Sequence, residues 1–142
     1  MSANSRLTIA IHALTWTASH ERLGGEWTTS DQIAKSVKTN PVVIRRLMAE
    51  LVKAGLLESA RGPGAGWRLS RRPEEITLGQ VAAALGADPT FAMHRNEPSP
   101  ICPIAQGIRP ALAPVYARVD EAVRRELERT TVAEVLSDTL PL

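Results

Sequence analysis

The sequence has little cysteine, few aromatic residues and no long apolar run. Cys102 is the only cysteine in 142 residues, which excludes an internal disulfide framework and a four-cysteine metal site from one chain. Phenylalanine and tyrosine occur once each, so no aromatic platform is available for stacking single-stranded bases. No run could cross a bilayer, and the first twenty residues lack a signal-peptide layout. We therefore expect a cytoplasmic chain without a membrane partner.

The net charge of +2 hides an asymmetry between the two halves. Residues 1–72 carry eleven Lys or Arg against five acids, whereas residues 73–142 carry six Arg against ten acids. The first half is therefore basic and the second acidic. A basic half suggests a large anionic partner, of which nucleic acid is the commonest. A solvated surface that happens to be basic would give the same counts, so both interpretations stay open at this point.

Apolar residues at helical spacing predict three helices in the basic half. The first buries a stripe that begins at Leu7 and ends at Ala18. The second and third are joined by the short turn "KTN", and the third is amphipathic and basic, which is typical of a helix-turn-helix. The expected caps and terminator, in chain order, are Asn4 or Ser5, Thr29 with Gln32, Asn40 with Pro41, and Gly55.

A glycine-rich loop, "RGPGAG" from Arg61, separates two strand-like segments, "LLESA" and "WRLS". It lacks the Lys-Ser/Thr pair and the following helix of a nucleotide-binding loop. The order of three helices and a hairpin predicts a winged helix, with "EWTT" able to add a third strand. A wing tip needs glycine for close approach to a duplex and cations to reach phosphates. An ordinary flexible hairpin is the alternative.

The acidic half predicts three more helices. Thr77 and Gln80 form a capping box for a helix that ends at Gly86, and Thr130 or Thr131 begins a last short helix. Between them, we expect a helix of about sixteen residues, roughly 24 Å long, from Pro114, with Pro110 and Pro114 kinking its approach or setting its start. Its stripe, which packs within the chain or against a second copy, is Leu112, Val115, Val119, Ala122, Val123 and Leu127.

The segment "TNPVVIRRLMAELVKAGLLESARGPGAGWRLSRRPEEITLGQV" resembles the DNA-binding module of the Rrf2 family of bacterial transcription regulators. The likeness extends over nearly the whole chain, from "NSRLTIAIHAL" to "TTVAEVL", and departs at Ala65, where glycine is usual. It implies a mainly α fold with a small β-wing. Residues 1–72 would form the winged helix-turn-helix, and residues 73–142 an effector loop and dimerisation helices.

The resemblance also implies a homodimer that regulates transcription, as a repressor, by binding a partly palindromic double-stranded DNA operator. Residues at the start of the third helix would then reach base edges, and flanking residues would hold phosphates. The expected groove contacts are Thr39, Asn40, Val42, Val43, Arg45 and Arg46. The expected phosphate or wing contacts are Ser5, Arg6, Lys38, Arg61, Gly62, Gly64 and Arg68.

Many Rrf2 regulators hold an iron–sulfur cluster on three cysteines in the loop before the long helix, whereas this chain has only Cys102 there. His94 and Cys102 make a poor ligand set, so we expect no cluster and no other cofactor. Cys102 is either a thiol sensor of oxidants or an inert cysteine. A winged-helix module that binds protein is a further alternative. No orienting third group accompanies Cys102 and His94, so we expect no enzyme.

Overall fold

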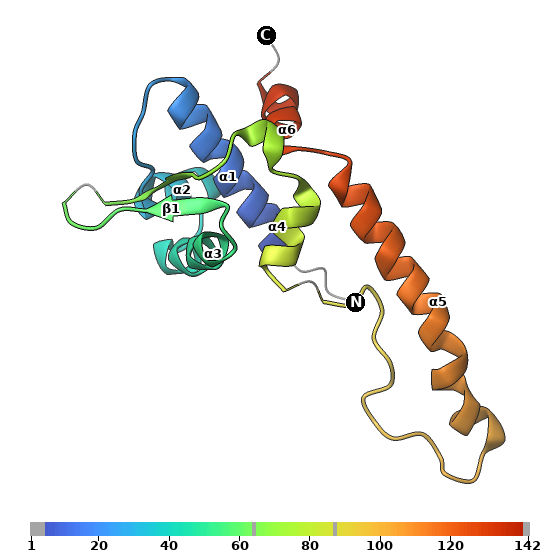
Figure 1. Cartoon of the computed structure of the whole chain (residues 1–142). Helices are drawn as coiled ribbons and strands as arrows, with labels where there is room; N and C mark the ends of the chain where they lie inside the picture. Colours follow the sequence, from blue (N-terminus) through green and yellow to red (C-terminus); the bar gives the residue numbers. More distant parts are fainter. Residues whose placement is uncertain (1–4, 64, 87, 141–142) are drawn as a thin grey trace.

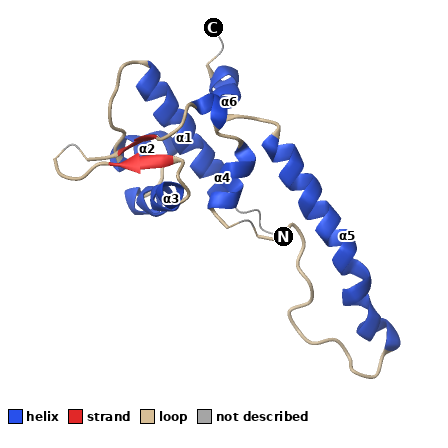
Figure 2. Ribbon diagram, viewed as in Figure 1, coloured by secondary structure: helices blue, strands red, loops and turns tan. Residues whose placement is uncertain are grey.

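The computed structural model describes residues 5–63, 65–86 and 88–140. Within them the chain forms six α-helices, one short 3-10 helix and a two-stranded antiparallel sheet (Figures 1 and 2). This confirms the predicted fold class, mainly α with a small β-wing. In chain order the elements are α1 Arg6–Arg22, α2 Ser30–Val37, α3 Pro41–Lys53, β1 Leu57–Ser59, β2 Trp67–Leu69, η1 Pro73–Glu75, α4 Leu78–Ala84, α5 Pro103–Glu128 and α6 Val132–Thr139.

Local capping chemistry sets most helix starts. The hydroxyl oxygens of Thr29, Thr77 and Thr131 each accept a hydrogen bond from the backbone N–H of the residue three positions later. The side chain of that residue accepts in turn from the backbone N–H of the threonine, which completes a capping box. Asn40 caps α3 through the Val42 N–H at 2.9 Å. Ser5 stands at the N-cap of α1 but makes no side-chain cap bond, and Asn4 lies outside the described residues.

The core gathers around α1, which runs through the middle of the helical body (Figure 1). Small residues on α1, such as Ala10 and Ala13, leave room for the buried side chains of α2 and α3. α6 packs against α1 from the other end of the chain and adds Val132 and Leu136 to the same core. The core therefore includes residues from both expected domains, 1–72 and 73–142. The division at residue 72 stays a prediction about the roles of the two parts.

The backbone ties α6 to the start of α4. The Val132 N–H donates to the Ile76 carbonyl at 2.8 Å, and the Leu78 N–H donates to the Thr130 carbonyl at 2.9 Å. Thr77 and Thr131, the N-caps of the two helices, form an isolated antiparallel bridge. We call residues 5–86 and 129–140, apart from 64, the head.

The expected start of the long helix was wrong. α5 begins at Pro103, eleven residues before Pro114, and both Pro110 and Pro114 lie inside it. Each proline removes one i to i−4 hydrogen bond, but both prolines are exposed and α5 has no buried residue, so water can satisfy the carbonyls left over. With 26 residues, α5 is about 39 Å long. No helix in the described ranges is both long enough and apolar enough to span a membrane.

Candidate nucleic-acid interface

The helix-turn-helix is α2, the turn 38–40 and α3. The turn is tight because Lys38 adopts the left-handed conformation, with φ +63°, and both Lys38 and Thr39 donate their backbone N–H to the Ala34 carbonyl. The inner face of α3 is buried at Ile44, Met48 and Leu51. The opposite face is therefore the one that α3 presents to a partner.

That outer face is apolar at its start and basic one turn later. Val42 and Val43 are 41% and 37% exposed, although β-branched apolar side chains usually lie inside. Arg45 and Arg46 follow and are exposed. A helix presenting valines and arginines at its N-terminal end has the groups that read thymine methyls and guanine edges in a major groove.

Arg45 is linked to the neighbouring helix. Its guanidinium donates to the hydroxyl of Ser30, the first residue of α2, at 3.2 Å. Arg45 is the fifth residue of α3, and its side chain therefore reaches back to the N-terminal end of α2. The partial positive charge of the α2 N-terminus adds to that of the Arg45 guanidinium beside it, which favours an anion at this edge of the helix pair.

The hairpin pairs Leu57 with Leu69 and Ser59 with Trp67, as expected for the wing. Thr28 of the segment "EWTT" joins it by two 2.8 Å backbone bonds to Trp67, a single bridge in place of the full third strand that the sequence allowed. Gly66 makes this approach possible. A Cβ there would lie 2.2 Å from the Thr28 carbonyl oxygen, so any larger residue would push the wing away.

The wing cations differ in their surroundings. Arg61 and Gly62 are exposed at the tip, whereas Gly64 lies outside the described residues. Arg68 donates to the Glu58 carboxylate at 2.9 Å, and its guanidinium lies 4.6 Å from the centre of the Trp27 ring. This cation–π contact stiffens the base of the wing. Trp27 is not among the residues expected from sequence, where its only signal is a tryptophan in a short polar segment.

Two further predicted contacts lie on α1. Ser5 is exposed at its N-cap. Arg6 binds both carboxylate oxygens of Glu50 on α3, at 2.9 and 2.7 Å, and donates to the Leu85 carbonyl at 3.4 Å. Arg6 therefore links α1 to α3 and to the end of α4, and a phosphate would have to compete with Glu50 for it.

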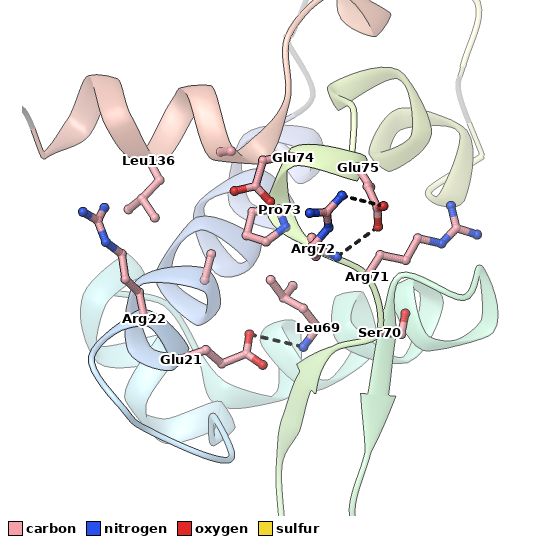
Figure 3. A pocket seen from close by; sticks show the side chains of 12 residues that line it. Glu21, Arg22, Leu69, Ser70, Arg71, Arg72, Pro73, Glu74, Glu75 and Leu136 are labelled. Carbon is pink, nitrogen blue, oxygen red and sulfur yellow. Dashed lines mark hydrogen bonds and ion pairs between the residues drawn. The ribbon is translucent and has the colours of Figure 1, made fainter.

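A cavity of about 720 Å³ lies between the end of α1, β2 and η1 (Figure 3). On its wall the Leu69 N–H donates to the Glu21 carboxylate at 3.4 Å, and Arg72 pairs with Glu75. Burial raises the pKa of Glu21, against the lowering effect of the Leu69 N–H. The lining of the cavity mixes acidic residues and arginines, so it has no uniform charge. We assign to the Glu21 carboxylate the role of holding β2 against α1.

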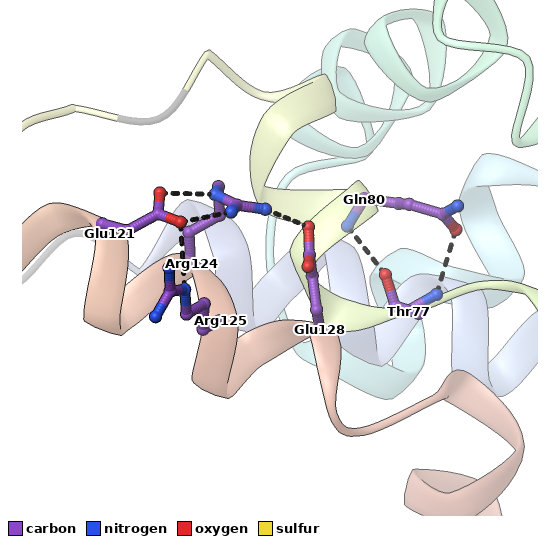
Figure 4. A network of polar contacts seen from close by, with 6 residues as sticks. All are labelled: Thr77, Gln80, Glu121, Arg124, Arg125 and Glu128. Carbon is purple, nitrogen blue, oxygen red and sulfur yellow. Dashed lines mark hydrogen bonds and ion pairs between the residues drawn. The ribbon is translucent and has the colours of Figure 1, made fainter.

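Beyond the head, residues 88–128 form what we call the arm, which consists of a loop and α5. α5 extends away from the body (Figure 1) and has no buried residue. Val123 and Leu127 line a cavity shared with α4, while Val115 is 40% exposed. Arg124 bridges Glu121 and Glu128 next to the start of α4 (Figure 4). The predicted stripe is thus partly turned toward α4 and partly uncovered.

The residues present do not fit an iron–sulfur cluster. Cluster ligation needs several thiolates, with His sometimes replacing one or two, and one chain offers only the Cys102 thiol. In the described part of the chain no three His, Cys, Asp or Glu side chains gather as a metal site would require. Cys102 is partly exposed at the N-cap of α5. Its role as a sensor stays a prediction.

Known proteins show the same pattern. The Rrf2 family profile, described as an iron-dependent transcriptional regulator, matches residues 3–138. The chain is 39% identical over 136 residues to YwnA of Bacillus subtilis, a candidate HTH-type transcriptional regulator, with 94% of this chain and 96% of YwnA covered. It is 32% identical over 123 residues to the HTH-type transcriptional regulator NsrR of Geobacillus kaustophilus, with 82% and 78% covered.

Solved structures agree on the fold. That of a candidate DNA-binding protein is 34% identical, with a TM-score of 0.73 over 93% of this chain and 99% of that one. A candidate transcriptional regulator from Lactobacillus plantarum superposes with a TM-score of 0.79 at 24% identity, over 95% and 89% of the two chains. With the helix-turn-helix, the wing and the long helix in place, this chain belongs to the Rrf2 family of DNA-binding transcriptional regulators.

Proposed function

We propose that the protein acts as a homodimeric repressor that places α3 of each copy in the major groove of a partly palindromic operator. The observation that carries this proposal is the exposed N-terminal face of α3. Val42 and Val43 are exposed there next to Arg45 and Arg46. No packing need within the head accounts for two exposed valines beside two arginines, whereas a base edge does.

The basic charge of the head supports the same partner. Lys38 in the turn and Arg61 at the wing tip are both exposed, one just before α3 in the chain and one in the hairpin that follows it. Cations that flank a groove-reading helix hold the phosphates on either side, which fixes the register of the protein on the duplex. The expected phosphate contacts of Ser5, Arg6, Gly62, Gly64 and Arg68 remain part of this proposal, with Arg6 and Arg68 exchanging carboxylates for phosphates.

The arm supports a second copy as the partner of α5. A helix of 26 residues without one buried side chain has no core of its own to justify its stripe. Pairing two such helices would cover Leu112, Val115 and Val119 and would hold two heads at a fixed distance. Two-fold related recognition helices read half-sites about 34–36 Å apart, one helical turn of DNA.

Repression follows from where such a dimer sits. A protein that occupies two successive major grooves of a promoter excludes other proteins from the same surface.

A winged-helix module for protein partners would not need the arginines of α3 and the wing. Arginine and lysine there are what a phosphate backbone selects.

The test is a mobility-shift titration of duplex DNA from the promoter of the protein's own gene, repeated over a range of salt. Arg45→Ala and Arg46→Ala should each weaken operator binding by about 1–3 kcal/mol and leave binding to random DNA nearly unchanged. Arg61→Ala should weaken both alike and lower the salt slope by about one unit. Arg118→Ala, which changes an exposed arginine of α5, serves as the control.

Two results would contradict the proposal. Operator affinity that survives both α3 substitutions would remove α3 from the groove. A slope of affinity against salt that is flat for the wild type would remove DNA as the partner of the basic head.

A further inference from the structure

The loop of residues 88–101 lies along α5 in antiparallel fashion, and side chains of α5 fasten it at successive levels. Near the head, the Thr90 N–H donates to the Asp120 carboxylate at 2.8 Å. Next, the rings of Phe91 and Tyr116 lie 5.5 Å apart. At the far end, the Gln106 amide donates to the Ser99 carbonyl at 2.7 Å. Loop residues later in the chain thus meet α5 residues that are earlier, as in a hairpin.

Arg109 holds the middle of this loop. One terminal nitrogen donates to the carbonyls of His94 and Asn96, each at 3.0 Å. The other donates to the Glu97 carboxylate at 3.3 Å. Three successive acceptors from a loop without regular structure thus converge on one planar guanidinium, a geometry that a point-like ammonium would not match as well.

The position of Arg109 is set by these bonds. Its Nε is buried and, among the described residues, has no hydrogen-bond partner. An unpaired buried donor is unfavourable, so the Nε group does not itself favour this position. The hydrogen bonds of the two terminal nitrogens are therefore what hold the Arg109 side chain there. Within the segment 94–97, the loop makes its described side-chain bonds to α5 through Arg109 alone.

The same loop is where an iron-dependent relative would place its metal, and here the donors for a metal are lacking. Cys102 is the only thiol, and in the described part of the chain no three His, Cys, Asp or Glu side chains gather around one point. We propose that Arg109 is the positioning residue of this loop and orders it without iron, so that the path from α4 to α5 is set by side chains. The inference rests on the loop geometry and not on the DNA contacts proposed above.

Trypsin reports on this order directly. Arg95 is exposed in the middle of the fastened segment, and a protease cuts a segment that can leave the surface far faster than one that is held. The Arg109–Pro110 bond is a poor trypsin site, so replacing Arg109 removes no competing cut. The rate of cleavage at Arg95–Asn96, measured by mass spectrometry on the full-length protein without DNA, is therefore the readout.

Arg109→Ala should raise that rate at least tenfold, and Arg109→Lys should raise it nearly as much, because it keeps the charge but loses the fork. Arg118→Ala, on the same helix, should leave it unchanged. Glu97→Gln removes one acceptor only and should give a smaller increase, which keeps the test decisive if Arg109→Ala does not fold. Cleavage of the wild type should be the same with a chelator and after incubation with ferrous iron and sulfide.

The proposal is overturned if Arg109→Ala and Glu97→Gln are both cut at the wild-type rate. It is equally overturned if iron and sulfide slow cleavage of the wild type, since the loop would then depend on metal for its order. Because no DNA is present, neither result depends on the operator-binding proposal.

Discussion

The head and the arm are built in different ways. The head buries a continuous core that includes Leu14, Ile44 and Val132, all fully buried. α5 is the longest helix and buries none of its residues. Its contacts are ion pairs within the helix, bonds to the loop and a limited junction with α4.

This difference shows that the head and the arm are stabilised by different interactions. Burial of apolar side chains is the dominant favourable term in folding, and the head obtains it from a single chain. The arm leaves apolar side chains such as Val115 and Val123 exposed, and these are the side chains that the proposed second copy would cover. The predictions below test this division, from the largest expected effect to the smallest.

The largest effect should come from emptying the core of the head. Ile44→Ala removes a fully buried side chain from the inner face of α3 and should lower the free energy of unfolding by about 2–5 kcal/mol. Denaturant titration followed by circular dichroism measures it. Val42→Ala, on the exposed face of the same helix, should cost about 0.5 kcal/mol or less. Equal losses would mean that α3 is not oriented as described.

A substitution in the stripe of α5 should change the assembly of the protein and leave the folding of the head unchanged. Val119→Asp places a charge in the stripe of α5 and, if the interface with a second copy is dry, should weaken the dimer by several kcal/mol. Sedimentation would then show a dimer for the wild type at micromolar concentration and a monomer for the variant, with the unfolding transition of the head retained. Ser137→Asp, which adds the same charge at an exposed position of α6, should stay dimeric. A monomeric wild type would refute the paired-groove proposal.

A capping box begins α4, the helix of the head that contacts α5. Thr77→Ala removes the hydroxyl that accepts from the Gln80 N–H at 3.1 Å and should lower the free energy of unfolding by about 1 kcal/mol. Thr77→Ser keeps the hydroxyl and should recover most of that loss. If the serine variant were as unstable as the alanine variant, the methyl group and not the cap would be the cause.

The smallest effect should come from the surface ion pairs of α5. Hydrogen bonding to Arg124 lowers the pKa of Glu121 from 4.5 to about 2. The stabilisation from a lowered carboxyl pKa is present above pH 4.5 and is lost as the pH falls from there toward 2. Carboxyl titration by NMR should give a midpoint near 2, and Arg124→Met should move it up toward the ordinary value. A midpoint that Arg124→Met leaves unchanged would assign the shift to another group.

The local features of the fold were predictable because they depend on neighbours in sequence. The capping boxes at Thr29 and Thr77, the Asn40–Pro41 start and the glycine tip of the wing each need only a few consecutive residues. The same holds for the order of helices and hairpin, which identifies the outer face of α3 as a candidate for DNA contact. The structure leaves that face exposed at Val42, Val43, Arg45 and Arg46, and its role in DNA contact stays a prediction.

Two of the three features that the sequence did not reveal are contacts between residues far apart in the chain. The start expected at Pro114 lies eleven residues too late, because a proline is read from sequence as a helix boundary, although a helix without buried residues can carry prolines in its interior. Arg6 was assigned to phosphate without knowledge of Glu50, 44 residues away. The Arg109 bonds to the loop also span 12 to 15 residues, and no periodicity or motif announces them.

The sequence by itself determined the order of the helices, most of their caps, the glycine wing and the charge difference between the halves, because propensity, capping and composition act over short distances along the chain. Only the tertiary structure decided that α6 completes the core around α1, that Trp27 holds Arg68, and that Arg109 fastens the loop to α5. The physical reason is that burial and hydrogen bonding between distant segments depend on where the folded chain brings them, and nothing in the local sequence fixes that place.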